Sequence, residues 1–212
     1  MKPKDYHNYV IKNGKFIGKF EEMYQNVEDP WHHGNATAIQ YDLMLYLIDR
    51  YKICYERERK IVDIGCGKGA FTARLKKLRP RAQILAIDIA PTAIKKAKQK
   101  YGYLGIDFRV MDIRREYKNI TEKFDLIIMS QLVWYVLPNF QKIAVDLVKK
   151  ALKRNGYLLI SQAFYKPEEQ KYGKEIIQTL EDVISLINLK PIEVIEANRF
   201  SNYNAVVLFK NK

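Results

Sequence analysis

From residue 60 onward, short apolar runs alternate with segments whose apolar residues recur at helical spacing, and this alternation restricts the possible fold more than any other feature. The expected strands are 60–64, 83–88, 107–110, 124–130 and 156–162, and the expected helices are 70–78, 92–101 and 140–152. Apolar strands separated by amphipathic helices are typical of βα units, in which helices cover both faces of a parallel sheet. The sequence therefore predicts an α/β fold with a doubly wound sheet.

The C-terminal part of the chain departs from this alternation. A long helix is expected over 168–189, followed by strand-like segments at 192–200 and 205–210 that the turn-like residues 201–204 connect. Two strands joined by so few residues form an antiparallel hairpin. We therefore expect a mostly parallel sheet that an antiparallel hairpin closes.

Residues 1–57 precede the alternation and are expected to form an N-terminal arm and helix, with the main domain over 58–212. Apolar residues at helical spacing predict one amphipathic helix within 36–52, and Asn35 is its expected N-cap. Upstream, the aromatic-rich segment 20–34 is interpreted as a loop-like arm that packs over the ligand-binding edge of the sheet. A plain N-terminal extension without a role at the site is the alternative.

The chain is strongly basic, with 37 Lys and Arg against 24 Asp and Glu and a formal net charge of +13. Such a surplus suits a nucleic acid, a membrane surface or an anionic substrate. The basic clusters 74–81, 95–100 and 149–154 each lie at the expected C-terminus of a helix, where cations complement the helix dipole. We therefore favour solvated helix faces over a nucleic-acid surface as the origin of the charge.

The sequence contains no apolar run near the ~20 residues that span a bilayer. Residues 1–16 also lack the apolar core of a signal peptide. We therefore expect a cytoplasmic location and no membrane partner. Cys54 and Cys66 do not form a CxxC pair, so they are expected to be reduced thiols, and no metal site is expected.

The segment 61–72, IVDIGCGKGAFT, places three glycines between an expected strand and an expected helix. Glycine lets the chain turn sharply and lets a ligand approach the backbone. The helix that follows offers free N–H groups at its N-terminus. Gly65, Gly67 and Ala70 also satisfy the GxGxxA spacing of dinucleotide-binding proteins. A nucleotide-like ligand is therefore expected here, and an NAD-dependent dehydrogenase stays open as an alternative.

Three aspartates lie at or just after the ends of three consecutive expected strands. Asp63 lies two residues before the first glycine, Asp88 closes the second strand, and Asp112 follows the third. Asp88 comes about 20 residues after the middle glycine, the separation expected for a carboxylate that binds ribose hydroxyls. The carboxyl ends of parallel strands face the crevice in which doubly wound sheets bind ligands. A single Asp is more often a turn or cap residue, whereas three in register indicate a binding site.

Together these motifs resemble those of class I S-adenosylmethionine-dependent methyltransferases over residues 60–210. The acid-x-Gly-x-Gly-x-Gly motif of that family matches Asp63, Gly65, Gly67 and Gly69, and its second- and third-strand acids match Asp88 and Asp112. Segments 124–136 and 152–161 resemble the family's fourth and fifth strand regions. The resemblance implies an enzyme with a Rossmann-like, seven-stranded sheet that uses S-adenosyl-L-methionine and releases S-adenosyl-L-homocysteine.

The arm carries a second resemblance. Its segment 20–31 is similar to an arm of bacterial small-molecule methyltransferases, among them the nodulation protein S type and relatives in surface-polysaccharide gene clusters. In these enzymes the arm closes over the cofactor, and Tyr24 and Trp31 would match its aromatic contacts.

These resemblances imply roles for particular residues. Asp88 would hold the ribose, Asp112 the adenine amino group, and Asp63 the glycine loop or the amino-acid group. The residues expected to contact the cofactor are Asp63, Gly65, Cys66, Gly67, Gly69, Asp88, Ile89, Asp112, Ile113, Ser130, Trp31 and Tyr24.

Fewer candidates lie on the side of the methyl acceptor. Gln131, Trp134 and Tyr165 follow the fourth and fifth strands and are the expected substrate contacts. His32, His33 and Tyr135 are the catalytic candidates, the histidines because imidazole titrates near neutral pH. The alternative is that the histidines are exposed loop residues and the aromatic residues belong to the core.

The expected function is methyl transfer from S-adenosylmethionine to an N or O atom of a small polar molecule. A sugar, an amino sugar or a nucleotide-linked or phosphorylated precursor of a surface polysaccharide is the expected substrate class, and an anionic substrate is compatible with the basic charge. The alternatives are a ribosomal or transfer RNA methyltransferase, an NAD-dependent dehydrogenase and a binding protein without activity. The oligomeric state is open between monomer and homodimer.

Overall fold

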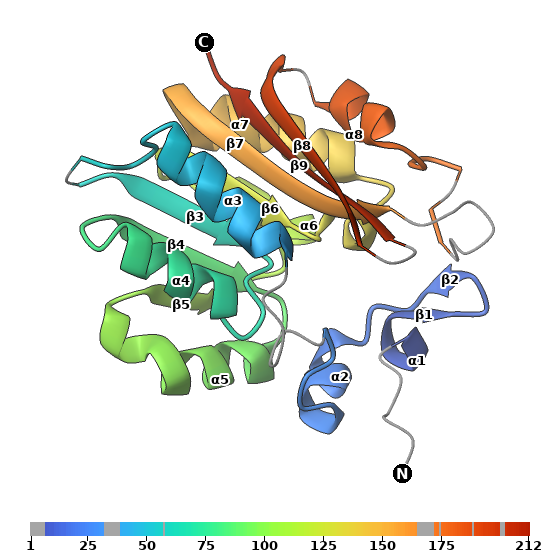
Figure 1. Cartoon of the computed structure of the whole chain (residues 1–212). Helices are drawn as coiled ribbons and strands as arrows, with labels where there is room; N and C mark the ends of the chain where they lie inside the picture. The colour runs from blue at the N-terminus through green and yellow to red at the C-terminus, as the bar shows by residue number, and fades with distance from the viewer. Residues whose placement is uncertain are drawn as a thin grey trace.

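The structure is a computed structural model of the chain (Figure 1). It describes residues 7–31, 39–56, 58–164, 172–173, 175–187, 189–199 and 202–212. Its centre is a seven-stranded sheet with the strand order β5-β4-β3-β6-β7-β9-β8. The strands are β3 (Lys60–Ile64), β4 (Gln83–Asp88), β5 (Asp107–Val110), β6 (Phe124–Ser130), β7 (Leu152–Phe164), β8 (Pro191–Arg199) and β9 (Asn202–Lys210).

The strand pairing confirms the predicted sheet. Strand β3 pairs in parallel with β4 on one side and with β6 on the other, while β5 extends the parallel sheet beyond β4 and β7 extends it beyond β6. Strand β9 is antiparallel to both β7 and β8. The order of the parallel strands reverses between β3 and β6, and open α/β sheets bind ligands at such a switch point.

Helices cover both faces of the sheet, as expected for a doubly wound fold (Figure 1). One face packs against α3 (Ile39–Arg50), α4 (Ala70–Leu78) and α5 (Pro91–Tyr101). The other packs against α6 (Ile113–Glu116), α7 (Phe140–Ala151) and α8 (Leu180–Leu186). Three short 3₁₀ helices, η1 (Gly102–Leu104), η2 (Tyr117–Asn119) and η3 (Val133–Tyr135), lie in the connections.

The prediction of one long helix over 168–189 is wrong for the residues of this range that the structure describes. Helix α8 begins only at Leu180, because the Thr179 hydroxyl accepts a hydrogen bond from the N–H of Asp182 and the Asp182 carboxylate accepts one from the N–H of Thr179. Upstream, Gly173 has a φ of +71°, a conformation that does not continue a right-handed helix.

The N-terminal arm contains more regular structure than expected. It forms α1 (His7–Val10), a small hairpin of β1 (Ile11–Lys12) and β2 (Lys15–Phe16), and α2 (Phe20–Asn26), which replaces the predicted loop. Phe20, Met23 and Tyr24 of α2 are buried against Ala90 and Ala93. The domain boundary predicted after residue 57 stays a prediction, and residue 57 lies outside the described part of the chain. The predicted N-cap, Asn35, also lies outside it.

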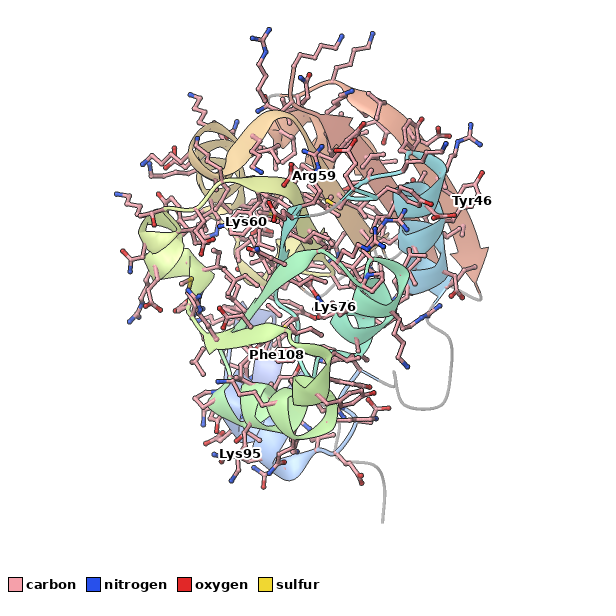
Figure 2. The ribbon with its side chains drawn as sticks, turned by 90° about the vertical axis from the view of Figure 1, so that its left-hand side faces the viewer. Tyr46, Arg59, Lys60, Lys76, Lys95 and Phe108 are labelled. Atoms are coloured by element: carbon pink, nitrogen blue, oxygen red, sulfur yellow. The ribbon has the colours of Figure 1, made fainter. Side chains whose placement is uncertain are left out.

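The basic side chains are distributed over several elements. Figure 2 shows Lys76 on α4 and Lys95 on α5, with Arg59 and Lys60 near the start of β3. The ammonium group of Lys76 donates to the carbonyl of Ala82, just beyond the C-terminal end of α4. Within the described residues, no helix combines the length and the apolar character that crossing a bilayer requires.

Candidate active site

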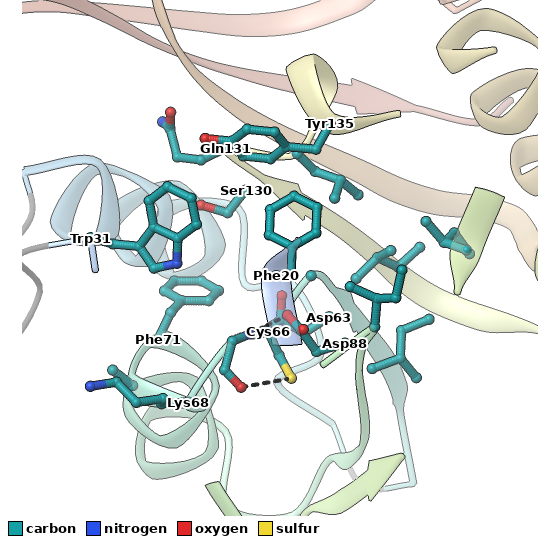
Figure 3. A pocket seen from close by; sticks show the side chains of 18 of the residues that line it. Phe20, Trp31, Asp63, Cys66, Lys68, Phe71, Asp88, Ser130, Gln131 and Tyr135 are labelled. Atoms are coloured by element: carbon teal, nitrogen blue, oxygen red, sulfur yellow. Dashed lines mark hydrogen bonds between the residues drawn. The ribbon is translucent and has the colours of Figure 1, made fainter. Parts of the chain in front are cut away.

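A cavity of about 390 Å³ lies at the carboxyl ends of the central strands, at the switch point between β3 and β6 (Figure 3). Binding pockets for small molecules have volumes of about 300–1,000 Å³. Lining residues from the sheet edge and the turns that follow it are Asp63, Ile64, Gly65, Cys66, Gly67, Lys68, Ile87, Asp88, Ile89, Met111, Asp112, Ile113, Arg114, Ser130, Gln131, Leu132, Tyr135 and Val136. The structure thus brings all three predicted aspartates into one cavity.

The glycine turn forms one wall of the cavity. Gly67 has a φ of +54°, and a Cβ added there would lie 2.8 Å from the hydroxyl oxygen of Tyr24. Gly69 differs from its neighbours, because it does not line the cavity. Its φ of +76° and the ring of Phe108, 2.9 Å from an added Cβ, show that glycine is needed there to pack α4 against the sheet. The structure therefore gives Gly69 a packing role, and its predicted contact with the cofactor stays a prediction.

Asp88 links the end of β4 to the glycine turn. Its carboxylate accepts hydrogen bonds from the N–H of Gly67 at 2.8 Å and of Ala90 at 2.9 Å. Burial raises the pKa of Asp88, and these backbone hydrogen bonds act in the opposite direction. A carboxylate has about four acceptor sites, so both oxygens keep the capacity to accept hydroxyl groups of a ligand in the cavity.

Asp63 lies beneath the same turn and is 2% exposed. Its carboxylate accepts a hydrogen bond of 2.5 Å from the hydroxyl of the buried Thr72 on α4. Burial raises the pKa of Asp63 to about 6. A buried carboxylate with a single neutral partner has unused acceptor capacity, and a cationic group of a ligand would stabilise its ionised form.

Asp112 is the N-cap residue of α6 and forms an ion pair with Arg114. Its carboxylate accepts a bond from the N–H of Arg114 and two bonds of 2.9 Å from the Arg114 guanidinium. Partial burial opposes ionisation, but these bonds hold the pKa of Asp112 below its usual value. Both side chains line the cavity.

The arm covers the cavity from the opposite side. The buried Tyr24 accepts a hydrogen bond of 2.8 Å from the indole N–H of Trp31, and the Trp31 side chain lines the cavity. Lys96 donates to the carbonyl of Tyr24 at 2.7 Å, and Lys68 of the glycine turn donates to the carbonyl of Glu28. These contacts connect the arm to both the glycine turn and α5.

A further contact fixes the start of α2. The carboxylate of Glu21 accepts bonds from the N–H of Thr92 at 2.9 Å and from its hydroxyl at 2.6 Å, in the first turn of α5. Burial opposes ionisation of Glu21, but the bonds from Thr92 lower its pKa below the ordinary value. A carboxylate at a helix N-terminus also interacts favourably with the helix dipole.

Aromatic rings border the side of the cavity that faces the arm. The ring of Tyr135 lies 5.3 Å from that of Phe20 and 5.7 Å from that of Trp31, measured between centroids. All three line the cavity (Figure 3). Trp134 does not, because its indole N–H donates to the carbonyl of Ala163 and its side chain is 7% exposed in the core. The structure therefore places Trp134 behind the site, not at the predicted substrate contact.

Several residues that line the cavity were not predicted from the sequence, and three predicted site residues lie outside the described part of the chain. His32, His33 and Tyr165 lie outside it, so their predicted roles stay predictions. The additional lining residues are Phe20, Asp29, Gln40, Tyr41, Ile64, Lys68, Ala70, Phe71, Ile87, Ala163 and Asn204, together with Met111, Arg114, Leu132 and Val136. Many adjoin predicted motifs, whereas Asn204 lies within the expected hairpin turn 201–204, which carries no sequence signal of a binding site.

The charges in the cavity differ from those of the whole chain. Four aspartates, Asp29, Asp63, Asp88 and Asp112, line it, while Lys68 and Arg114 are its cations among the described residues. The guanidinium of Arg114 forms an ion pair with the carboxylate of Asp112, and the Nζ atom of Lys68 lies 3.9 Å from Oδ1 of Asp29. The cavity is therefore net negative in a chain of net charge +13.

These features fit S-adenosylmethionine. Its sulfonium and ammonium groups suit a net-negative cavity, and its ribose hydroxyls match the acceptor capacity of Asp88.

Comparisons with known proteins agree with this fit. A family model described as a methyltransferase domain matches residues 56–197, more than half of the chain. Malonyl-[acyl-carrier protein] O-methyltransferase from Anoxybacillus flavithermus is 40% identical over 103 residues, which are 48% of this chain and 38% of that protein. Ribosomal RNA small subunit methyltransferase C from Serratia proteamaculans is 30% identical over 114 residues, 54% of this chain and 31% of that protein. This chain thus spans less than half the length of both relatives.

Solved structures show the same fold at low sequence identity. The N-methyltransferase NodS from Bradyrhizobium japonicum in complex with S-adenosyl-L-homocysteine has a TM-score of 0.72 and 21% identity, covering 94% of this chain and 99% of NodS. Magnesium protoporphyrin IX methyltransferase from Synechocystis with bound S-adenosylmethionine has a TM-score of 0.69 and 14% identity, covering 96% and 99%. The chain therefore belongs to the methyltransferase-domain family, which confirms the family that the sequence motifs resemble.

Proposed function

We propose that this chain transfers a methyl group from S-adenosylmethionine to an N or O atom of a small polar molecule. One observation carries the proposal. A single cavity connects the glycine turn and Asp88 with a second wall formed by Ser130, Gln131 and Tyr135 (Figure 3). The first part suits the cofactor and the second leaves space for an acceptor beside it.

Each predicted cofactor residue that lines the cavity has a position consistent with its proposed role. Asp88 would accept the ribose hydroxyls, and Asp63 would compensate the ammonium group of the methionine part. Asp112, with Ile113 beside it, would face the adenine. S-adenosylmethionine supplies an activated sulfonium methyl group when bound.

The protein's main contribution to the reaction is alignment and exclusion of water. In-line displacement requires the acceptor atom, the methyl carbon and the sulfur to be collinear, and such positioning supplies ~7–11 kcal/mol in favourable cases. Phe20, Trp31 and Tyr135 form an aromatic cover over the acceptor side, and Glu21 and Lys96 hold the arm that carries two of these rings.

The need for a base depends on the acceptor. A neutral amine attacks without one, whereas an alcohol must lose its proton. Tyr135 is the one catalytic candidate that the structure describes, and its ring lines the acceptor side. We assign His32 and His33 the role of alternative bases, a role that mutation to Ala tests directly.

For the substrate class we propose a sugar, an amino sugar or a nucleotide-linked precursor. Aromatic rings next to neutral amide side chains suit molecules with many hydroxyl groups. The structural neighbour NodS is an N-methyltransferase, and several of the curated relatives are malonyl-[acyl-carrier protein] O-methyltransferases, so both acceptor atoms stay in the proposal. An RNA substrate is the second candidate, because the chain is basic and one relative is a ribosomal RNA methyltransferase.

The test is release of S-adenosylhomocysteine in the presence of a panel of amino sugars, nucleotide sugars, small amines and alcohols, and unmodified ribosomal RNA. We expect turnover with a small polar acceptor and none in the Asp88→Ala variant. Turnover with RNA alone would contradict the proposed substrate class. Folded protein that produces no S-adenosylhomocysteine with any acceptor would contradict the proposed activity.

A further inference from the structure

Asn204 is a buried polar residue at the acceptor end of the cavity. It lies on β9 directly opposite Ala163 of β7, is 8% exposed and lines the cavity. Its side-chain amide has no hydrogen-bond partner among the residues that the structure describes. The described residues whose side-chain polar atoms are fully buried without a partner are Gln131 and Gln162, so the amide of Asn204 is accessible from the cavity that it lines and is available to a ligand.

A second amide lies beside it. Gln131 follows β6 with a φ of +53°, and its side-chain oxygen accepts a bond of 2.9 Å from the N–H of Ala163. Its side-chain nitrogen is buried without a partner. Directly paired residues on antiparallel strands have Cβ atoms about 4.5–5.5 Å apart. Gln131 and Asn204 therefore both adjoin Ala163, and both have unused hydrogen-bonding capacity.

The described lining residues next to these amides at the ends of β6 and β7, namely Ser130, Leu132 and Ala163, are uncharged. The hydroxyls of Ser130 and Ser161 bond to each other at 2.9 Å on the neighbouring strand ends. The two cations among the described lining residues are already engaged, Arg114 with Asp112 and Lys68 with the arm. A carboxylate or phosphate placed beside the amides would therefore lose its hydration without gaining an unpaired cation, which is unfavourable.

We propose that Asn204 and Gln131 form an acceptor subsite that binds an uncharged oxygen group, a hydroxyl or an amide carbonyl, next to the atom that is methylated. The Gln131 nitrogen can only donate, while the Asn204 amide can both donate and accept. The subsite thus selects neutral polar acceptors over carboxylates and phosphates. This inference rests on the proposed methyl transfer and adds the substrate chemistry that this cavity favours.

The test compares matched acceptors in the wild type and in Asn204→Leu, a variant of similar volume without an amide. The pairs are glucosamine against glucosamine 6-phosphate and 2-aminoethanol against glycine, each at saturating S-adenosylmethionine. We expect the neutral-oxygen member of each pair to have the higher kcat/KM. Asn204→Leu should lower that value about 10- to 100-fold, the range for a lost hydrogen bond in a buried site. Binding of S-adenosylhomocysteine should stay within about twofold of the wild type.

Stability provides a second readout that needs no acceptor. An amide without a partner contributes no hydrogen bond to the fold, so the melting temperature of unliganded Asn204→Leu should equal or exceed that of the wild type. Asn204→Ala serves the same purpose if leucine does not fit. Gln83→Leu is the matched control, because Gln83 is exposed at the start of β4, far along the strand from the cavity.

The outcomes separate this inference from the proposed function. Absence of S-adenosylhomocysteine binding in the wild type contradicts the proposed function itself. Binding of that compound without methylation of either neutral-oxygen probe overturns the acceptor subsite. So does a faster reaction with the phosphate or carboxylate member, an unchanged kcat/KM in Asn204→Leu, or a lower melting temperature in both Asn204 variants.

Discussion

Replacing Asp88 by Asn changes the charge of the side chain at the centre of the site and leaves its size almost unchanged. The wild-type carboxylate receives two backbone hydrogen bonds, from Gly67 at 2.8 Å and from Ala90 at 2.9 Å. Asn has only one oxygen, so one of these N–H groups will face an NH₂ group instead of an acceptor. The variant therefore tests both the shape of the glycine turn and the proposed contact with ribose.

The expected magnitude follows from these contacts. A hydrogen bond to a charged group contributes about 1.5–3 kcal/mol, and a buried donor left without a partner costs about 1–3 kcal/mol. The lost ribose contact alone corresponds to a roughly 10- to 150-fold weaker affinity for S-adenosylhomocysteine. The lost backbone contact acts mainly on folding, since it is present with and without ligand.

Trp31 provides the assay, because it is one of two tryptophans and its side chain lines the cavity. In a Trp134→Phe background, its fluorescence reports titration with S-adenosylhomocysteine. Asp107→Asn is the matched control, an exposed Asp at the start of β5 whose partner is Arg109. If Asp88→Asn binds the ligand within about threefold of the control, the assignment of Asp88 is refuted.

The remaining predictions concern the acid beneath the glycine turn, the arm and the turn itself. The pKa of Asp63, raised to about 6 from 3.8, means that the stability linked to its protonated form is complete below pH 3.8 and lost as the pH rises through about 6. Asp63→Asn should remove this loss, worth roughly 2.4 kcal/mol between pH 4 and pH 8 in urea unfolding, and an unchanged pH profile would contradict it. Glu21→Gln should weaken arm docking by about 1 kcal/mol, because the charged acceptor for Thr92 is lost, and hydrogen exchange of residues 20–26 should accelerate. Because the pKa of Glu21 is lowered, the wild-type arm should loosen in the same way only as the pH falls through that pKa, and slow exchange in the variant would refute the contact. Gly69→Ala should cost about 2–4 kcal/mol through left-handed strain and overpacking. Gly105→Ala, where φ is +70° and no atom lies within 4 Å of the added Cβ, should cost only about 1–2 kcal/mol, and equal melting temperatures would contradict the difference.

The parallel part of the sheet could be predicted from the sequence because its signals are local. Strands β3, β4, β5 and β6 and helix α4 begin and end where the alternation of apolar runs places them. Buried strands of a parallel sheet are continuous apolar runs, and the helices between them carry one apolar face. The three aspartates could be found for the same reason, since strand ends and the glycine turn fix their positions along the chain.

The arm and the acceptor side could not be predicted in the same way. Helix α2 is short and depends on tertiary contacts, such as the bond from Lys96 to Tyr24 and the burial of Met23. The start of α8 depends on the capping box at Thr179, which the sequence-based interpretation overlooked. Asn204 reaches the cavity only because β9 pairs with β7, a contact between residues far apart in the sequence.

The central claim is that the cavity beneath the arm binds an adenosyl sulfonium compound, and calorimetric titration of the wild-type protein tests it most directly. The account predicts one site per chain for S-adenosylhomocysteine, with no comparable heat for NAD under the same conditions. Folded protein that binds NAD and not S-adenosylhomocysteine, or that binds neither, would contradict it.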